Sequence, residues 1–146
     1  MHTINIYNNQ KAVPVRINKL QLKSALKYIL RQERQPGGAF NFVFVDDREI
    51  RRINRQYLGR NNVTDVIAFS LPDRKGMPTD NIRGEVVVSV EEALRQSARR
   101  GIPLNKEIAL YCIHGLLHLV GYDDLTKIKR LKMERKQSDY LEMVKL

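Results

Sequence analysis

Two of the three histidines of this chain, His114 and His118, stand four residues apart within an apolar stretch. In an α-helix, residues i and i+4 lie on one face, so the two imidazole rings are expected side by side. Gly121 follows and can end the helix in a left-handed turn, which would bring Asp124 back to the histidines. Two histidines and one aspartate leave one position open, and that is the ligand set of a catalytic zinc ion.

The alternative is that the spacing arises by chance and the histidines only pack in the core. The helix that would carry them has almost no polar face, and buried imidazoles need polar partners. One shared metal ion satisfies both rings, which favours the metal site. The apolar residues of this helix are Ile108, Ala109, Leu110, Cys112, Ile113, Leu116, Leu117, Leu119 and Val120.

Gly115 follows the first histidine, where zinc proteases of the HExxH type carry a glutamate as general base. A metalloprotease is therefore the least favoured function. Cys112 lies on a different side of the helix from the histidines, so we assign it to the core and not to the metal.

The rest of the sequence predicts the elements that hold this site. Strand patterns occur at residues 3–7, 40–45, 66–69 and 84–90, with a short extended segment at 13–17. Helix patterns occur at 18–32, 47–57, 91–100, from 103 through the histidines, and at 126–143. Asn18 and Asp47 are the expected helix caps. Ile128, Leu131 and Leu141 are expected to dock the last helix.

This order predicts one α+β domain over residues 1–146, because no repeat or linker divides the chain. We expect a mixed sheet of about four strands with the helices mostly on one face. The metal site would lie on a core helix and on the turn after it.

Composition adds a second indication of function. The chain has 146 residues and a net charge of +10, which favours polyanions such as nucleic acid or an acidic membrane surface. A solvated surface that only keeps the protein soluble is the alternative. No apolar stretch approaches the length of a membrane span. A single cysteine and the lack of a signal-peptide pattern suit the cytoplasm.

Three segments together resemble one protein family. HGLLHLVGYDD at 114–124 is similar to the HGxLHLxGYDH signature of the rRNA maturation factor YbeY family. NRQYLG at 54–59 with TDVIAFS at 64–70, and GEVVVS at 84–89, resemble two further segments of that family. The resemblance runs from about residue 50 to 142.

The resemblance implies a metal-dependent endoribonuclease specific for single-stranded RNA, in which a metal-activated water attacks the phosphodiester. It also implies a role in 3′-end maturation of small-subunit rRNA and in ribosome quality control. The implied partners are RNA and the small ribosomal subunit, in the cytoplasm and away from membranes.

The chain departs from the family pattern at two positions. Asp124 replaces the third histidine ligand, and its spacing favours it over Asp123. We expect one Zn2+ per chain, although an aspartate oxygen also admits Mn2+ or another divalent ion. Leu58 stands where many members have an arginine; either Arg60, our RNA-binding candidate, takes over a phosphate contact, or this branch of the family does without it.

No catalytic residue is assigned beyond the metal ligands. Asp65 is better explained by a turn before a strand, and Tyr57 by packing. Arg95, Arg99 and Arg100 form either a phosphate track or a solvated helix face. The competing function is a non-catalytic RNA-binding factor of ribosome assembly whose metal is structural, and Leu58 and Asp124 are the evidence for it.

Overall fold

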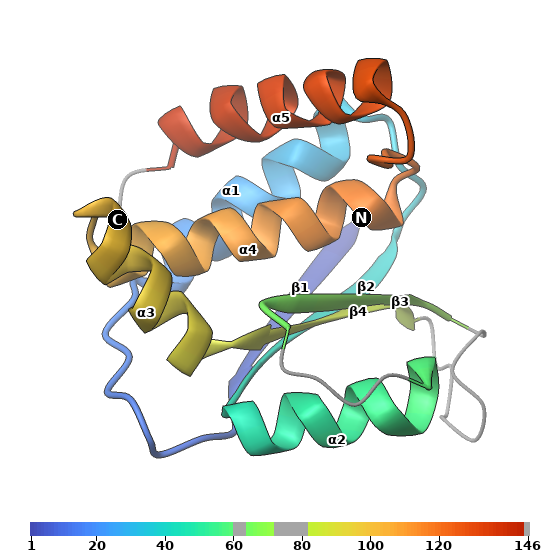
Figure 1. The fold of residues 1–146 in the computed structure, drawn as a ribbon. Coiled ribbons are helices and arrows are strands. Elements are labelled where there is room, and N and C mark those ends of the chain that lie inside the picture. The colour runs from blue at the N-terminus through green and yellow to red at the C-terminus, as the bar shows by residue number, and fades with distance from the viewer. Residues whose placement is uncertain (60–63, 72–81, 145–146) are drawn as a thin grey trace.

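The computed structural model describes residues 1–59, 64–71 and 82–144. These residues form four strands and five helices (Figure 1). The strands are β1 (His2–Asn8), β2 (Gly38–Val45), β3 (Val66–Ser70) and β4 (Ile82–Ser89). The helices are α1 (Lys19–Gln32), α2 (Asp47–Leu58), α3 (Val90–Arg100), α4 (Leu104–Leu119) and α5 (Lys127–Glu142).

The four strands form one mixed sheet in the order β1-β2-β4-β3. Strands β1, β2 and β4 are parallel, and β3 runs antiparallel to β4 at the edge. The predicted fold class, an α+β domain with a mixed four-stranded sheet, is therefore confirmed.

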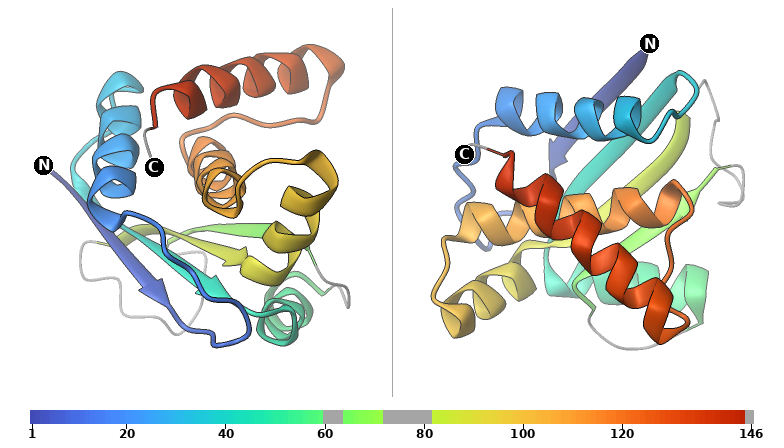
Figure 2. Two further views of the ribbon diagram at one scale, coloured as in Figure 1. Left: turned by 90° about the vertical axis from the view of Figure 1, so that its left-hand side faces the viewer. Right: turned by 90° about the horizontal axis from the view of Figure 1, so that it is seen from above.

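Helices cover the two faces of the sheet unequally. Helices α1 and α4 lie on one face, α2 lies on the other, and α5 crosses the outer side of α4 (Figures 1 and 2). Strand β2 shows why both faces need cover. Phe40, Phe42 and Phe44 enter the larger core under α1 and α4, whereas Val43 and Val45 face α2. Alternation along a strand sends successive side chains to opposite faces.

Most helix starts follow the sequence prediction, with one correction. The Asn18 side chain accepts a hydrogen bond from the Gln21 backbone N–H and caps α1. Helix α2 is capped by Asp46, not by Asp47, because the Asp46 carboxylate accepts from the Glu49 N–H. Residues 13–17 are not a strand; Val13 and Ile17 instead fill the edge of the larger core.

The docking face of α5 differs from the prediction. Ile128 is 81% exposed and Leu131 is 52% exposed, so neither docks the helix. Met133 and Tyr140 are buried in their place, and of the predicted set only Leu141 packs against the core. Met133 and Tyr140 are two turns apart and share a face, which rotates α5 away from the expected orientation.

Among the described residues, no helix is both long and apolar enough to cross a lipid bilayer.

Candidate metal centre

Helix α4 lies close against strand β4 because glycines occur on both sides of the contact. A methyl group added at Gly115 would lie 2.5 Å from Val86 Cγ1. One added at Gly84 of β4 would lie 2.7 Å from Leu119 Cδ1 of the helix. Larger side chains at either position would push the helix outward. The contact therefore fixes the rotation of α4 and the direction in which its histidines point.

His114 and His118 lie side by side, as the i, i+4 spacing predicts. Their Nε2 atoms are 3.0 Å apart, and the ring centroids are 4.6 Å apart. Both residues are half-buried. Burial lowers the pKa of His118, and the neighbouring His114 lowers it further. His118 is therefore neutral at pH 7, the form in which an imidazole can bind a metal.

The distance between the two nitrogens suits a shared metal ion. Two nitrogen ligands about 2.05 Å from a tetrahedral zinc lie roughly 3.3 Å apart. The observed 3.0 Å separation of the His114 and His118 Nε2 atoms is close to that value. Without a cation between them, two unprotonated nitrogens at this distance would repel, so one must carry a proton. The histidine pair thus fits a metal as two of its ligands.

The chain turns back after α4 in the way the sequence predicts. Gly121 has a φ of +110°. Its N–H donates to the His118 carbonyl at 3.2 Å, and the Tyr122 N–H donates to the Leu117 carbonyl at 3.0 Å. This pair of bonds is a Schellman motif. The Tyr122 hydroxyl then donates to Glu33 Oε1 at 2.8 Å, which anchors the turn to the end of α1.

Asp124 lies beyond this turn and is exposed. Its negative charge raises the pKa of His118, against the larger lowering effects of burial and of His114. Asp123 is used locally, since it accepts from the Leu125 N–H at 3.0 Å and pairs with Lys129 at 3.6 Å. Within the described part of the chain, no three His, Cys, Asp or Glu side chains are grouped closely enough to hold one ion. Asp124 as third ligand stays a prediction.

A pocket of about 290 Å³ lies directly beside His118. Leu58, from the end of α2, is 46% exposed at this pocket, while Asn54 is only 2% exposed. The remaining lining comes from edge strand β3 and the residues before it: Thr64, Val66, Ile67 and Ala68. The site therefore combines two imidazole nitrogens with a hollow that has both apolar and polar walls, a composition typical of ligand sites.

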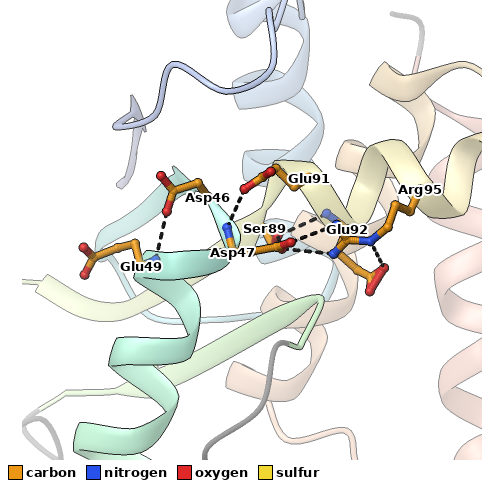
Figure 3. A network of polar contacts seen from close by, with 7 residues as sticks. All are labelled: Asp46, Asp47, Glu49, Ser89, Glu91, Glu92 and Arg95. Atoms are coloured by element: carbon orange, nitrogen blue, oxygen red, sulfur yellow. Dashed lines mark hydrogen bonds and ion pairs between the residues drawn. The ribbon is translucent and has the colours of Figure 1, made fainter.

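Two of the three arginines that could have formed either a phosphate track or a solvated helix face, Arg95 and Arg100, are paired with carboxylates. Arg95 pairs with Asp47 at 2.8 Å and with Glu92 at 3.0 Å, in a polar network that joins the starts of α2 and α3 (Figure 3). Arg100 lies 3.4 Å from the fully buried Glu107. These arginines hold helices together, which argues against a phosphate track along α3. The RNA-binding candidate Arg60 lies outside the described residues.

Two other residues have the structural roles that the sequence favours. Tyr57 packs edge-on against Phe69 with ring centroids 5.7 Å apart. The Asp65 carboxylate accepts from the Val66 N–H at 2.8 Å, and its carbonyl accepts from the Ser89 N–H at 2.9 Å. Asp65 thus fixes the start of β3.

Sequence reasoning missed one residue at the centre itself. The His114 Nδ1 atom is hydrogen-bonded to the Gln137 Oε1 atom, from helix α5. No local pattern marks Gln137, because its position depends on how α5 crosses α4. The sequence gives a partial indication of the buried Asn54, because a polar residue there interrupts an otherwise apolar stripe of the helix.

Comparisons with known proteins converge on one family. A model of the family described as Endoribonuclease YbeY matches residues 4–145. A protein named Endoribonuclease YbeY from Desulforamulus reducens is 36% identical over 143 residues, covering 94% of each chain. Another of that name from Syntrophus aciditrophicus is 39% identical over 121 residues, covering 82% of this chain and 74% of its own. The solution structure of TM1509 from Thermotoga maritima is similar with a TM-score of 0.67 and 29% identity, over 97% of this chain and 89% of that one.

Proposed function

The chain belongs to the endoribonuclease YbeY family, and from this we propose that it cleaves single-stranded RNA internally with the help of a divalent metal ion. We further propose that it acts in 3′-end maturation of small-subunit rRNA and in ribosome quality control. The observation that carries the proposal is the convergence of the His114 and His118 Nε2 atoms, 3.0 Å apart, beside the pocket at His118.

In this proposal His114, His118 and Asp124 hold one Zn2+ or another divalent ion per chain. Such an ion, when bound, supplies a Lewis acid that activates water and stabilises negative charge on a phosphoryl oxygen. The protein's own contribution is position. The Gly115 contact sets the direction of the histidines, and the Tyr122–Glu33 bond holds the turn that carries Asp124.

The pocket beside His118 would receive part of the RNA strand. Its described walls carry no lysine or arginine and include Leu58, Val66 and Ala68, which suits the face of an unpaired base more than a phosphate. A duplex keeps its bases stacked and paired, so a site of this kind favours single strands. The net charge of +10 attracts the phosphate backbone of RNA, and the small ribosomal subunit is the RNA-rich partner we propose, in the cytoplasm.

A non-catalytic RNA-binding factor of ribosome assembly is the second candidate, and Leu58 favours it. This exposed leucine lines the pocket where a cation would offset developing phosphate charge. A metalloprotease is disfavoured by packing as well as by sequence. A side chain at position 115 would begin 2.5 Å from Val86, which leaves no room for a glutamate base.

Cleavage of a labelled single-stranded RNA by nuclease-free, zinc-loaded protein tests the proposal. The same sequence in a duplex should be cut far more slowly. His114→Ala should abolish cleavage while circular dichroism shows the fold intact, and chelation should do the same to wild type.

The matched control is His2→Ala. His2 belongs to β1, at the sheet edge opposite β3, and its Nε2 atom lies 2.9 Å from the Gln35 carbonyl. Removal of this imidazole should leave cleavage unchanged. Tight RNA binding without cleavage by any metal-loaded form would instead favour the non-catalytic RNA-binding factor.

A further inference from the structure

The side of His114 that faces away from His118 is occupied by a residue from helix α5, which crosses α4. His114 Nδ1 is hydrogen-bonded to Gln137 Oε1 of α5, while His114 Nε2 lies 3.0 Å from His118 Nε2. The two ring nitrogens of His114 therefore have different partners. One points at an amide oxygen and the other at the candidate metal position.

The amide oxygen of Gln137 dictates where the imidazole proton resides. A carbonyl oxygen can only accept, so the Nδ1 atom of His114 must donate. In a neutral ring this leaves the lone pair on Nε2, directed toward His118. An imidazole nitrogen binds a metal only through such a lone pair, so the bond prepares His114 as a ligand.

Gln137 is itself held firmly by the way α5 docks. Met133 precedes it by one turn, Tyr140 follows by three residues, and both are buried on the same side of the helix. The Tyr140 hydroxyl donates to Glu33, whose carboxylate also lies 3.4 Å from Lys136. These contacts fix α5 both before and after Gln137, so its amide is not free to follow the ring.

We propose that Gln137 is a positioning residue, which holds His114 in the Nδ1–H tautomer and aims its Nε2 lone pair at the metal. The part of this inference that concerns metal binding rests on the proposed function, whereas the part that concerns the tautomer of His114 does not. Loss of an outer hydrogen bond to a metal-binding histidine typically weakens metal affinity by about 10–100-fold.

The first measurement is zinc affinity, by competition with a chelating dye. Gln137→Leu keeps roughly the same volume but removes the acceptor, and should weaken zinc binding by about 10–100-fold. Gln137→Glu restores an acceptor oxygen and should recover at least wild-type affinity. Ser138→Ala, at the exposed neighbouring position of α5, is the matched control and should leave zinc affinity unchanged.

The second measurement needs no metal. Nitrogen-15 NMR of the imidazoles in metal-free protein should show His114 as the Nδ1–H tautomer in wild type and in Gln137→Glu. Gln137→Leu should give a mixture of the two tautomers. His114 found as Nε2–H in wild type would overturn the proposal, because the amide nitrogen would then face the ring.

The two measurements separate this inference from the proposed function. If wild type binds no zinc but the tautomer responds to Gln137→Leu, the positioning role stands and the metal proposal fails. If wild type binds zinc and Gln137→Leu changes neither affinity nor tautomer, Gln137 is only a packing residue. Should Gln137→Leu fail to fold, Gln137→Ala with the same two readouts decides between these outcomes.

Discussion

In the proposed metal site, His114 and His118 would supply two ligands of the same kind from one helix, so the third ligand would decide which metal the site prefers. An imidazole nitrogen suits zinc well, whereas a carboxylate oxygen is harder and also suits Mn2+ or Mg2+. As the proposed third ligand, Asp124 would therefore make the site less selective than a third histidine would. The turn at Gly121, with its φ of +110°, would be needed to bring back either residue.

Changing the third ligand should change the metal affinity of the site. Asp124→His should tighten zinc binding, and His114→Ala should weaken it by more than about 100-fold, since removing a ligand costs more than removing an outer hydrogen bond. Competition titration with zinc and Mn2+ measures both effects. Asp123→His is the control, because Asp123 serves the turn through Leu125 and Lys129. Equal zinc affinity in wild type and His114→Ala would reduce the histidine pair to core packing.

The pKa of Glu33 is set by opposing effects. Burial alone would raise its pKa, but hydrogen bonds from Tyr140 and Tyr122 and the charge of Lys136 together lower the pKa below its usual value. A carboxylate with a lowered pKa stabilises the folded state above the unfolded-state pKa of about 4.3, and that stability is lost as pH falls through the folded pKa.

Glu33→Gln should therefore lower the free energy of unfolding by about 1–3 kcal/mol at pH 7, where charged hydrogen bonds are lost. The difference from wild type should shrink as the pH drops below about 4. Urea denaturation of metal-free protein at several pH values measures it. Glu134→Gln, at an exposed position of α5, is the control and should show no such pH dependence. If the loss of unfolding free energy in Glu33→Gln stays constant from pH 7 to pH 3, the shape of the side chain and not its charge stabilises the fold at this position.

At the scale of elements, the contact between α4 and β4 decides the geometry of the site. Gly115→Ala gains helix propensity of about 1 kcal/mol, but it forces a methyl group against Val86, and such overpacking costs roughly 1–3 kcal/mol. The variant should therefore be no more stable than wild type. It should also bind zinc more weakly, because α4 must shift or rotate.

Val86→Ala supplies the matched test of that explanation. Alone it leaves a cavity and should destabilise by roughly 1–3 kcal/mol. In the double variant the methyl group added at position 115 enters the space that Val86 leaves, so the loss should be smaller than the sum of the two single losses. A double-mutant cycle by thermal or urea unfolding measures the coupling. Strict additivity would mean that the two positions do not compete for the same space.

The elements also show which parts of the site are predictable from sequence. The histidine pair and the Gly121 turn depend on local helical geometry, so spacing alone predicts them. Gln137 lies 23 residues from its partner His114, and its place depends on how α5 docks. The apolar residues of α5 do not form a single stripe along the helix. The prediction that Ile128 docks α5 is wrong because nothing in the local sequence distinguishes it from the buried Met133.

On the molecule as a whole, exposed positive charge gathers on two helices, while the described walls of the pocket beside His118 carry no lysine or arginine. Exposed arginines occur along α2, on one face of the sheet, and a basic helix, α5, crosses α4 beyond the other face (Figure 2). The cations of α2 are Arg48, Arg51, Arg52 and Arg55, and those of α5 are Lys127, Lys129, Arg130, Lys132, Arg135 and Lys136. These two helices therefore offer a polyanion positive charge on both sides of the sheet.

Affinity for RNA should therefore depend steeply on salt, with log K falling by about 0.7 per neutralised phosphate on a single strand. Arg60→Ala should reduce the magnitude of this slope by about 0.7 to 1 and weaken unrelated RNA sequences alike, because a phosphate contact carries no base information. Fluorescence anisotropy of metal-free protein across a salt series measures both effects without cleavage.

Lys11→Ala is the matched control, since Lys11 follows β1 at the sheet edge opposite β3 and the pocket. An unchanged slope in Arg60→Ala would make Arg60 an ordinary surface charge, leaving no phosphate contact to compensate for Leu58. A wild-type affinity that barely responds to salt would count against RNA as the polyanion that this charge attracts, whatever the metal site does.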